Sequence, residues 1–238
     1  FIHHLASTCY NIYMAVEVNG MLVAAHELKA PLSLMRQLAL AIDFADETTC
    51  QRYRSQLINV SERALRQVND LVKIARLEDG FFETEPVSVR GVCEAVLSEL
   101  SPFFRIEGRS IDLEFHNKSR LAVANHDLLY SIVYNFCVNA MHYSERGSVS
   151  EVVISERRSR LRISVRDYGP ALPTKVWREL NAGGLDRPTE IAMRPGSSGL
   201  GLYIASQFAA HMRAQIGPVR HRDGASFYVD LPISKQIS

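Results

Sequence analysis

The sequence lacks the features of a disulfide-bonded, zinc-binding, membrane-spanning or strongly charged protein. It has only four cysteines in 238 residues, and none of them stands in a CxxC or CxxxC pair. We therefore expect isolated thiols in a reducing compartment instead of disulfides or a zinc site. The formal net charge is +1, which gives no strong general attraction to nucleic acid or to an anionic membrane surface. No apolar run is long enough to cross a bilayer.

The amino terminus also lacks a targeting signal. The first twenty residues have no basic leader, and Glu17 interrupts their apolar content, so they do not predict a signal peptide. The chain opens on Phe1 and not on Met, so we expect a fragment of a longer protein, with any membrane anchor in segments outside it. What is present is an ordinary globular balance of 47% hydrophobic and 22% charged residues, which suits one large domain or two small ones.

Hydrophobic spacing predicts two long helices in residues 1–80. The first is expected to end near residue 45, because apolar side chains recur before it at three- and four-residue intervals. Asp46 opens a capping turn, and a second helix with a near-heptad stripe should run to about Leu77, before Gly80. We expect a homodimer in which two such hairpins form a four-helix bundle. The alternative is that the stripes pack against the rest of the same chain.

Residues 81–238 mix strands and helices without a regular repeat. The charged run 156–160 is expected to be the turn of a hairpin, and residues 183–198, rich in Gly, Pro and Ser, form a loop. This irregular order predicts an α/β or α+β sandwich. Strands are expected at 86–89, 111–115, 121–124, 151–155, 161–165 and around 227–231, and helices at 90–104, 126–143 and 200–213.

The stretch His26-Glu27-Leu28-Lys29-Ala30-Pro31-Leu32 carries a candidate nucleophile. Imidazole near its pKa is partly neutral at pH 7, so one ring nitrogen has a free lone pair. Pro31 removes a helical hydrogen bond and should bend the helix just after His26. A lone histidine on a helix is usually an ordinary surface residue, so His26 is singled out only by its neighbours Glu27 and Pro31.

Three motifs further along the chain could hold a nucleotide. Asn135 and Asn139 lie one helical turn apart, and an amide oxygen can ligate Mg²⁺ beside phosphates. Asp167 follows a strand, where its carboxylate could accept a hydrogen bond from an exocyclic amine such as that of adenine. The glycines of residues 196–202 open a helix and present backbone N–H groups to an anion. Alone, each motif has an ordinary explanation: a polar helix face, an Asx turn or a linker.

In this order the motifs resemble those of bacterial two-component sensor histidine kinases, and the resemblance covers nearly all of residues 20–233. His26 to Leu32 resembles the phosphoacceptor box, Asn135 to Tyr143 the asparagine box, Asp167 to Gly169 the first glycine box and Ser197 to Leu202 the second. The resemblance implies an all-α helical hairpin of the HisKA type at residues 1–80, part of a dimeric four-helix bundle. It implies an α/β sandwich of the histidine kinase ATPase (Bergerat) type at residues 81–238.

The resemblance also implies a reaction and its residues. His26 would take a phosphoryl group from ATP and pass it to an Asp of a response regulator, with Glu27 as the catalytic partner that holds the other ring N–H. Asn139 would ligate Mg²⁺, and residues 183–198 would be a lid. The parent protein would be a membrane-tethered bacterial sensor, this part of it cytoplasmic. The residues expected at the nucleotide are Asn135, Asn139, His142, Tyr143, Asp167, Gly169, Arg194, Gly199, Leu200 and Gly201.

Some positions depart from the family pattern. Ala30 stands where many members have a Thr or Asn linked to dephosphorylation, His142 stands where a Lys is common, and Ala171 replaces a glycine. One alternative is therefore a degenerate kinase that acts as a dimeric nucleotide- or partner-binding module. Another is an ATP hydrolase, but hydrolases of this fold carry a Glu where Asn135 stands. Since an amide cannot act as a base, Asn135 favours transfer to His26 over transfer to water.

Overall fold

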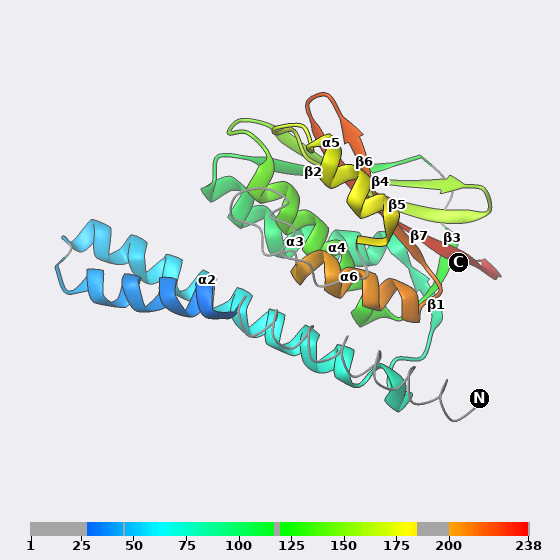
Figure 1. The fold of residues 1–238 in the computed structure, drawn as a ribbon, viewed down its shortest axis with the longest axis horizontal. Coiled ribbons are helices and arrows are strands. Elements are labelled where there is room, and N and C mark those ends of the chain that lie inside the picture. Colours follow the sequence, from blue (N-terminus) through cyan, green and yellow to red (C-terminus); the bar gives the residue numbers. More distant parts are fainter. Residues whose placement is uncertain (1–27, 45, 117–119, 185–199, 238) are drawn as a thin grey trace. The chain divides into compact units, whose positions relative to one another are not determined.

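The computed structural model describes residues 28–44, 46–116, 120–184 and 200–237 (Figure 1). They belong to two compact units that divide between Ala75 and Arg76, a few residues before the domain boundary predicted from the sequence. No helix in these described ranges is both long and apolar enough to cross a membrane. The three cysteines within them are free and buried, as expected: Cys50, Cys93 and Cys137.

The first unit contains a helix at residues 28–42 and helix α2, Glu47–Ala75. Asp46 caps α2 as predicted, because its two carboxylate oxygens accept hydrogen bonds from the backbone N–H and the hydroxyl of Thr49, both at 2.9 Å. A 3₁₀ turn, Leu77–Asp79, follows α2 and ends at Gly80, which has a left-handed φ of 78°. The predicted stop at Gly80 is thus confirmed.

The second unit is built on one seven-stranded sheet in the order β1-β3-β7-β5-β4-β2, with β6 paired to β7. Only the β2–β4 pair is parallel among the strand pairs of the described residues. The long strand β7 pairs with β6 and β5 along its first half and with β3 near its end. The strands are β1, Glu85–Ser88; β2, Ser110–Phe115; β3, Arg120–Ala124; β4, Val149–Arg157; β5, Arg160–Arg166; β6, Gln215–His221; and β7, Gly224–Ile237.

Three helices of this unit lie together on one face of the sheet (Figure 1). Strand β5 shows why, because Leu161, Ile163 and Val165 are buried and alternate with partly exposed polar residues. The helices bury their own apolar residues toward this side of the sheet, which gives the two-layer sandwich that the sequence predicts. The helices are α3, Val89–Ile106; α4, His126–Tyr143; and α6, Leu200–His211; the short α5, Thr174–Glu179, precedes a π-helical segment, Leu180–Gly184.

The structure differs from the sequence-based elements at the β4–β5 turn, at strand β6 and at helix α5, which was not expected. The turn predicted at residues 156–160 is shorter, because the strands run to Arg157 and from Arg160, and only Arg158 and Ser159 turn the chain, both at positive φ. Strand β6 was not expected, because Gly217 and Pro218 usually mark turns. It pairs only with β7 among the described strands, and an edge strand tolerates a proline that cannot donate a hydrogen bond.

Candidate nucleotide-binding site

Helix α4 carries the asparagine motif toward helix α6. The side chain of Asn125 caps α4 by accepting from the backbone N–H groups of Asp127 and Leu128. Farther along, Asn135 donates its amide N–H to the Ser131 carbonyl at 2.9 Å. Its amide oxygen faces α6, where a Cβ placed on Gly201 would lie 2.8 Å away. The asparagine motif and the second glycine motif therefore meet, and the missing side chain of Gly201 permits it.

Asn139 lies one turn beyond Asn135 on the same side of α4 and is partly exposed. No side-chain hydrogen bond joins Asn139 to another residue in the described ranges. An amide oxygen so placed can serve as a ligand for a hard cation. The structure therefore fits the metal-ligand role predicted for Asn139.

The first glycine motif packs against the end of α4. A Cβ on Gly169 would lie 1.8 Å from the backbone oxygen of Tyr143, so no side chain fits at this position. Two further bonds tie the segments: Tyr168 N–H donates to Ser144 Oγ at 3.2 Å, and Glu145 N–H donates to the Tyr168 carbonyl at 2.8 Å. The asparagine and first glycine motifs therefore share one contact region.

Asp167 is a buried carboxylate, 3% exposed, held by the start of strand β7. Its Oδ1 accepts from the Ala225 N–H at 3.1 Å, and its own backbone N–H donates to the Ala225 carbonyl at 2.9 Å. Burying a carboxylate is costly unless hydrogen bonds compensate. These bonds fix Asp167 at the end of β5, beside the glycine that the resemblance assigns to the base pocket.

Charged and aromatic side chains frame Asp167. Arg166 pairs with Asp223 at 2.6 Å and lies over the ring of Tyr168, 4.5 Å from its centroid. The pair with Arg166 lowers the pKa of Asp223 below its usual range. Tyr168 donates its hydroxyl to Glu151 at 2.8 Å, and this bond raises the pKa of Tyr168. This frame restrains the loop that carries Asp167.

The structure brings most of the predicted nucleotide residues into one region, at the end of α4 and the start of α6. His142 is exposed on the last turn of α4, and Leu200 begins α6 with its side chain buried. Four predicted residues and most of the predicted lid, from residue 185 on, lie outside the described residues. These four are His26, Glu27, Arg194 and Gly199.

Sequence reasoning missed Gly224 and Ala225, which hold Asp167. A Cβ on Gly224 would lie 2.1 Å from the Asp167 backbone oxygen. The local signal was available, because Asp223-Gly224 is a strong hairpin-turn dipeptide. What the dipeptide does not reveal is which distant residue the turn contacts.

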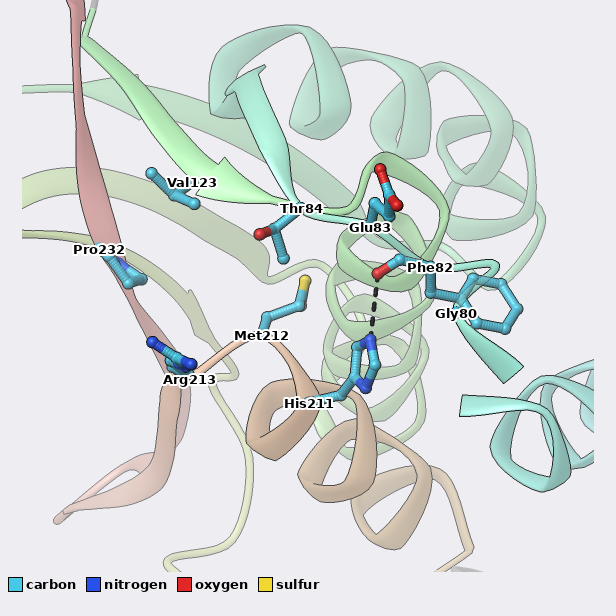
Figure 2. Close-up of a pocket in the computed structure, with 9 residues that line it drawn as sticks. All are labelled: Gly80, Phe82, Glu83, Thr84, Val123, His211, Met212, Arg213 and Pro232. Carbon is cyan, nitrogen blue, oxygen red and sulfur yellow. Dashed lines mark hydrogen bonds between the residues drawn. The ribbon is translucent and has the colours of Figure 1, made fainter. Parts of the chain in front are cut away.

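A cavity of about 550 Å³ lies at the opposite end of α6 from Gly201. Figure 2 shows that it is bounded by Gly80 and residues 82–84, by residues 211–213 at the end of α6, and by Val123 and Pro232. There His211 Nε2 is 3.0 Å from the Phe82 carbonyl oxygen. None of the predicted nucleotide residues lines this cavity, so it is separate from the candidate site.

The fold is a two-layer α/β sandwich, and comparisons with known proteins identify others that share it. The family model of histidine kinase-, DNA gyrase B-, and HSP90-like ATPases matches residues 124–235. Sensor histidine kinase AruS of Pseudomonas aeruginosa is 28% identical over 232 residues, which cover 88% of this chain and 22% of AruS. Residues 124–235 are thus similar to this ATPase family, and the chain as a whole is similar to bacterial sensor histidine kinases.

Solved structures share the fold. Full-length ShkA in complex with AMPPNP is 25% identical, with a TM-score of 0.60 over 94% of this chain and 47% of ShkA. Histidine kinase ThkA in complex with the response regulator protein TrrA is 14% identical, with a TM-score of 0.65 over 95% of this chain and 65% of ThkA. The chain spans about a fifth of AruS and about half of ShkA.

Proposed function

We propose that the chain is the catalytic part of an ATP-dependent protein-histidine kinase of a two-component system. The observation that carries the proposal is the convergence of three sequence motifs at one end of α4 and α6. There Asn135 meets Gly201, Tyr143 meets Gly169, and Asp167 is buried beside them. Similarity to AruS and to the AMPPNP complex of ShkA supports it.

Each residue of the site has a proposed part in holding ATP. Asp167 accepts a hydrogen bond from the adenine amine, and Gly169 lets the backbone approach the base. Gly201, with Gly199, lies beside the phosphates at the amino end of α6. Asn139 holds Mg²⁺ through its amide oxygen, and bound Mg²⁺ neutralises charge on the phosphate oxygens.

His26 is the proposed acceptor. The unprotonated ring nitrogen forms a bond to the γ-phosphorus as the bond from that phosphorus to the β–γ bridging oxygen breaks, so ADP leaves. Glu27 accepts a hydrogen bond from the other ring N–H, which fixes the reactive tautomer, and takes up that proton. Asn135 cannot act as a base toward water, so hydrolysis does not compete at this position. Positioning supplies most of the rate.

The proposed partners are a second copy of the chain and the receiver domain of a response regulator. Exposed apolar residues on α2 support a homodimeric four-helix bundle. The TrrA complex of ThkA supports the second partner. The phosphoryl group then moves from the ring nitrogen of His26 to an Asp carboxylate of the receiver domain, and Glu27 returns the proton to the other ring nitrogen, which restores the neutral imidazole.

The test is phosphoryl transfer from γ-labelled ATP with Mg²⁺ to the full chain. We expect acid-labile, base-stable label on the wild type and none on His26→Gln, with nucleotide affinity unchanged within about twofold. The matched control is His116→Gln, at an exposed histidine after β2, which should label normally. Undiminished labelling of His26→Gln would reject the acceptor. Failure of the wild type to bind ADP or ATP would favour the degenerate module to which His142 and Ala171 point.

A further inference from the structure

The turn between β6 and β7 packs directly on Asp167. The strand register pairs His221 with Gly224 and leaves Arg222 and Asp223 at the tip. Gly224 has a φ of +135°, and a Cβ there would lie 2.1 Å from the Asp167 backbone oxygen and 2.8 Å from its Oδ1. Since both atoms belong to a buried residue in the sheet, any side chain at position 224 must displace the turn or the carboxylate.

The residue after the glycine fixes the direction of that carboxylate. Ala225 bonds to Asp167 twice, once through its N–H to Oδ1 at 3.1 Å and once through its carbonyl to the Asp167 N–H at 2.9 Å. With Oδ1 held in this way, the turn restrains the rotation of the carboxylate. The direction in which Asp167 accepts a hydrogen bond from a base then depends on the turn as well.

An ion pair joins the turn to β5, the strand that ends just before Asp167. Arg166, which precedes Asp167, reaches Asp223, which precedes Gly224, at 2.6 Å. His221 Nε2 lies 2.8 Å from Ser226 Oγ and closes the base of the turn. The turn is therefore tied to β5 on one side of Asp167 and packed against Asp167 itself.

We propose that Gly224 and Ala225 are positioning residues for base recognition, which give the site its preference for a purine with an exocyclic amine over one with a carbonyl at the same carbon. The proposal rests on the proposed function, because it takes Asp167 as the residue that binds the base. An ionised carboxylate only accepts hydrogen bonds. The carboxylate of Asp167 accepts a hydrogen bond from the amine of the base and is repelled by a carbonyl oxygen at the same carbon. Both effects depend on the direction in which the carboxylate points.

The test measures the affinities of ADP and inosine diphosphate for the full chain by calorimetry. We expect the wild type to prefer ADP by about tenfold or more, the size of one hydrogen bond to a charged group. Gly224→Ala should reduce this preference to below about threefold, mostly by weakening ADP. The ratio of two affinities measured on one sample does not depend on the folded fraction.

Two controls separate positioning from general damage. Gly217→Ala is the matched glycine change in the same strand pair, where the new Cβ meets the hydroxyl of Tyr228 at 2.6 Å instead of Asp167. It should leave the preference unchanged. Asp223→Ala breaks the ion pair with Arg166 without adding a clash and should lower the preference by a smaller factor. Its matched control is Glu156→Ala, which breaks the Arg120 pair elsewhere in the sheet.

Asp167→Asn distinguishes a failure of the proposed base-binding role of Asp167 from a failure of the positioning role of Gly224 and Ala225. If it leaves the ratio of ADP to inosine diphosphate affinity unchanged, the base-binding role of Asp167 in the proposed function is wrong. If Asp167→Asn abolishes the preference but Gly224→Ala and Asp223→Ala do not alter it, the positioning inference is overturned and the proposed function stands. If Gly224→Ala does not fold, Asp223→Ala decides alone.

Discussion

The two units of the chain differ in how completely each covers its own apolar residues. In the sandwich, Phe104 and Phe208 are fully buried within one chain. In the helical unit, Leu40 and Leu65 are 56% and 63% exposed on the same single chain. The buried apolar residues of the helical unit within the described ranges are only Leu38, Cys50 and Ala64.

The exposed residues on α2 are regularly spaced. Ile58, Leu65 and Val72 recur every seven residues and are exposed. Ala64 of the same helix is buried, so α2 has both an inward and an outward apolar side. The comparison teaches that the sandwich folds on contacts within the chain, whereas the helical unit needs a second surface, in line with the proposed homodimer.

Phe104→Ala tests whether the sandwich is stabilised by contacts within the chain, and it has the largest expected effect. Truncating a fully buried phenylalanine of α3 should lower the free energy of unfolding by about 3–5 kcal/mol. The single tryptophan, Trp177 in α5, belongs to the sandwich, so its fluorescence during urea titration reports this unit. Leu65→Ala is the matched truncation in α2 and should shift the Trp177 transition by less than about 0.5 kcal/mol. Equal shifts of the Trp177 transition in the two variants would show that the two units do not differ in this way.

Leu65→Glu tests whether the exposed stripe of α2 in the helical unit joins two copies of the chain. A charge at the centre of the outward stripe removes about 1.5–3 kcal/mol of apolar burial in a dimer. The dissociation constant of the homodimer, measured by sedimentation equilibrium, should therefore rise at least about tenfold, while the Trp177 transition stays in place. Arg52→Glu, at an exposed polar position on another face of the same helix, is the control. A dimer unaffected by Leu65→Glu would mean that another surface joins the copies.

The sequence predicted elements well where local signals were complete. Helix α4 has the predicted bounds, because Asn125 caps it and a Ser follows its last residue. Strand β6 and α5 were missed, since Gly217 and Pro218 in β6 carry turn signals, and only pairing with β7 makes that segment a strand. The outward stripe of α2 was also missed, because periodicity shows that a helix is amphipathic but not how many neighbours it has.

The candidate site was predicted to a similar extent and for similar reasons. Asn135, Gly169 and Gly201 stand in short motifs, and the structure brings each motif against another along α4 and at its end. The contact of Asp167 with Ala225 joins residues 58 positions apart. No local pattern encodes such a pairing, because it depends on the register of β5 and β7.

Titration of His221 should have the smallest effect of these tests, and it concerns the stability of the sandwich unit alone. Burial, and then the charge of Arg166, lower the pKa of His221 below its ordinary value of about 6.5. The unfolded chain therefore binds a proton more readily than the folded one, so stability is full above pH 6.5 and declines as pH falls below it. His221→Gln should flatten the Trp177 urea midpoint between pH 7 and 5, and His116→Gln should not. The lowered pKa of Asp223 acts only in more acidic solution, because stability from a carboxylate of this kind is lost near and below its ordinary value. A wild-type midpoint that stays level from pH 7 to 5 would show that the histidine is equally basic in both states.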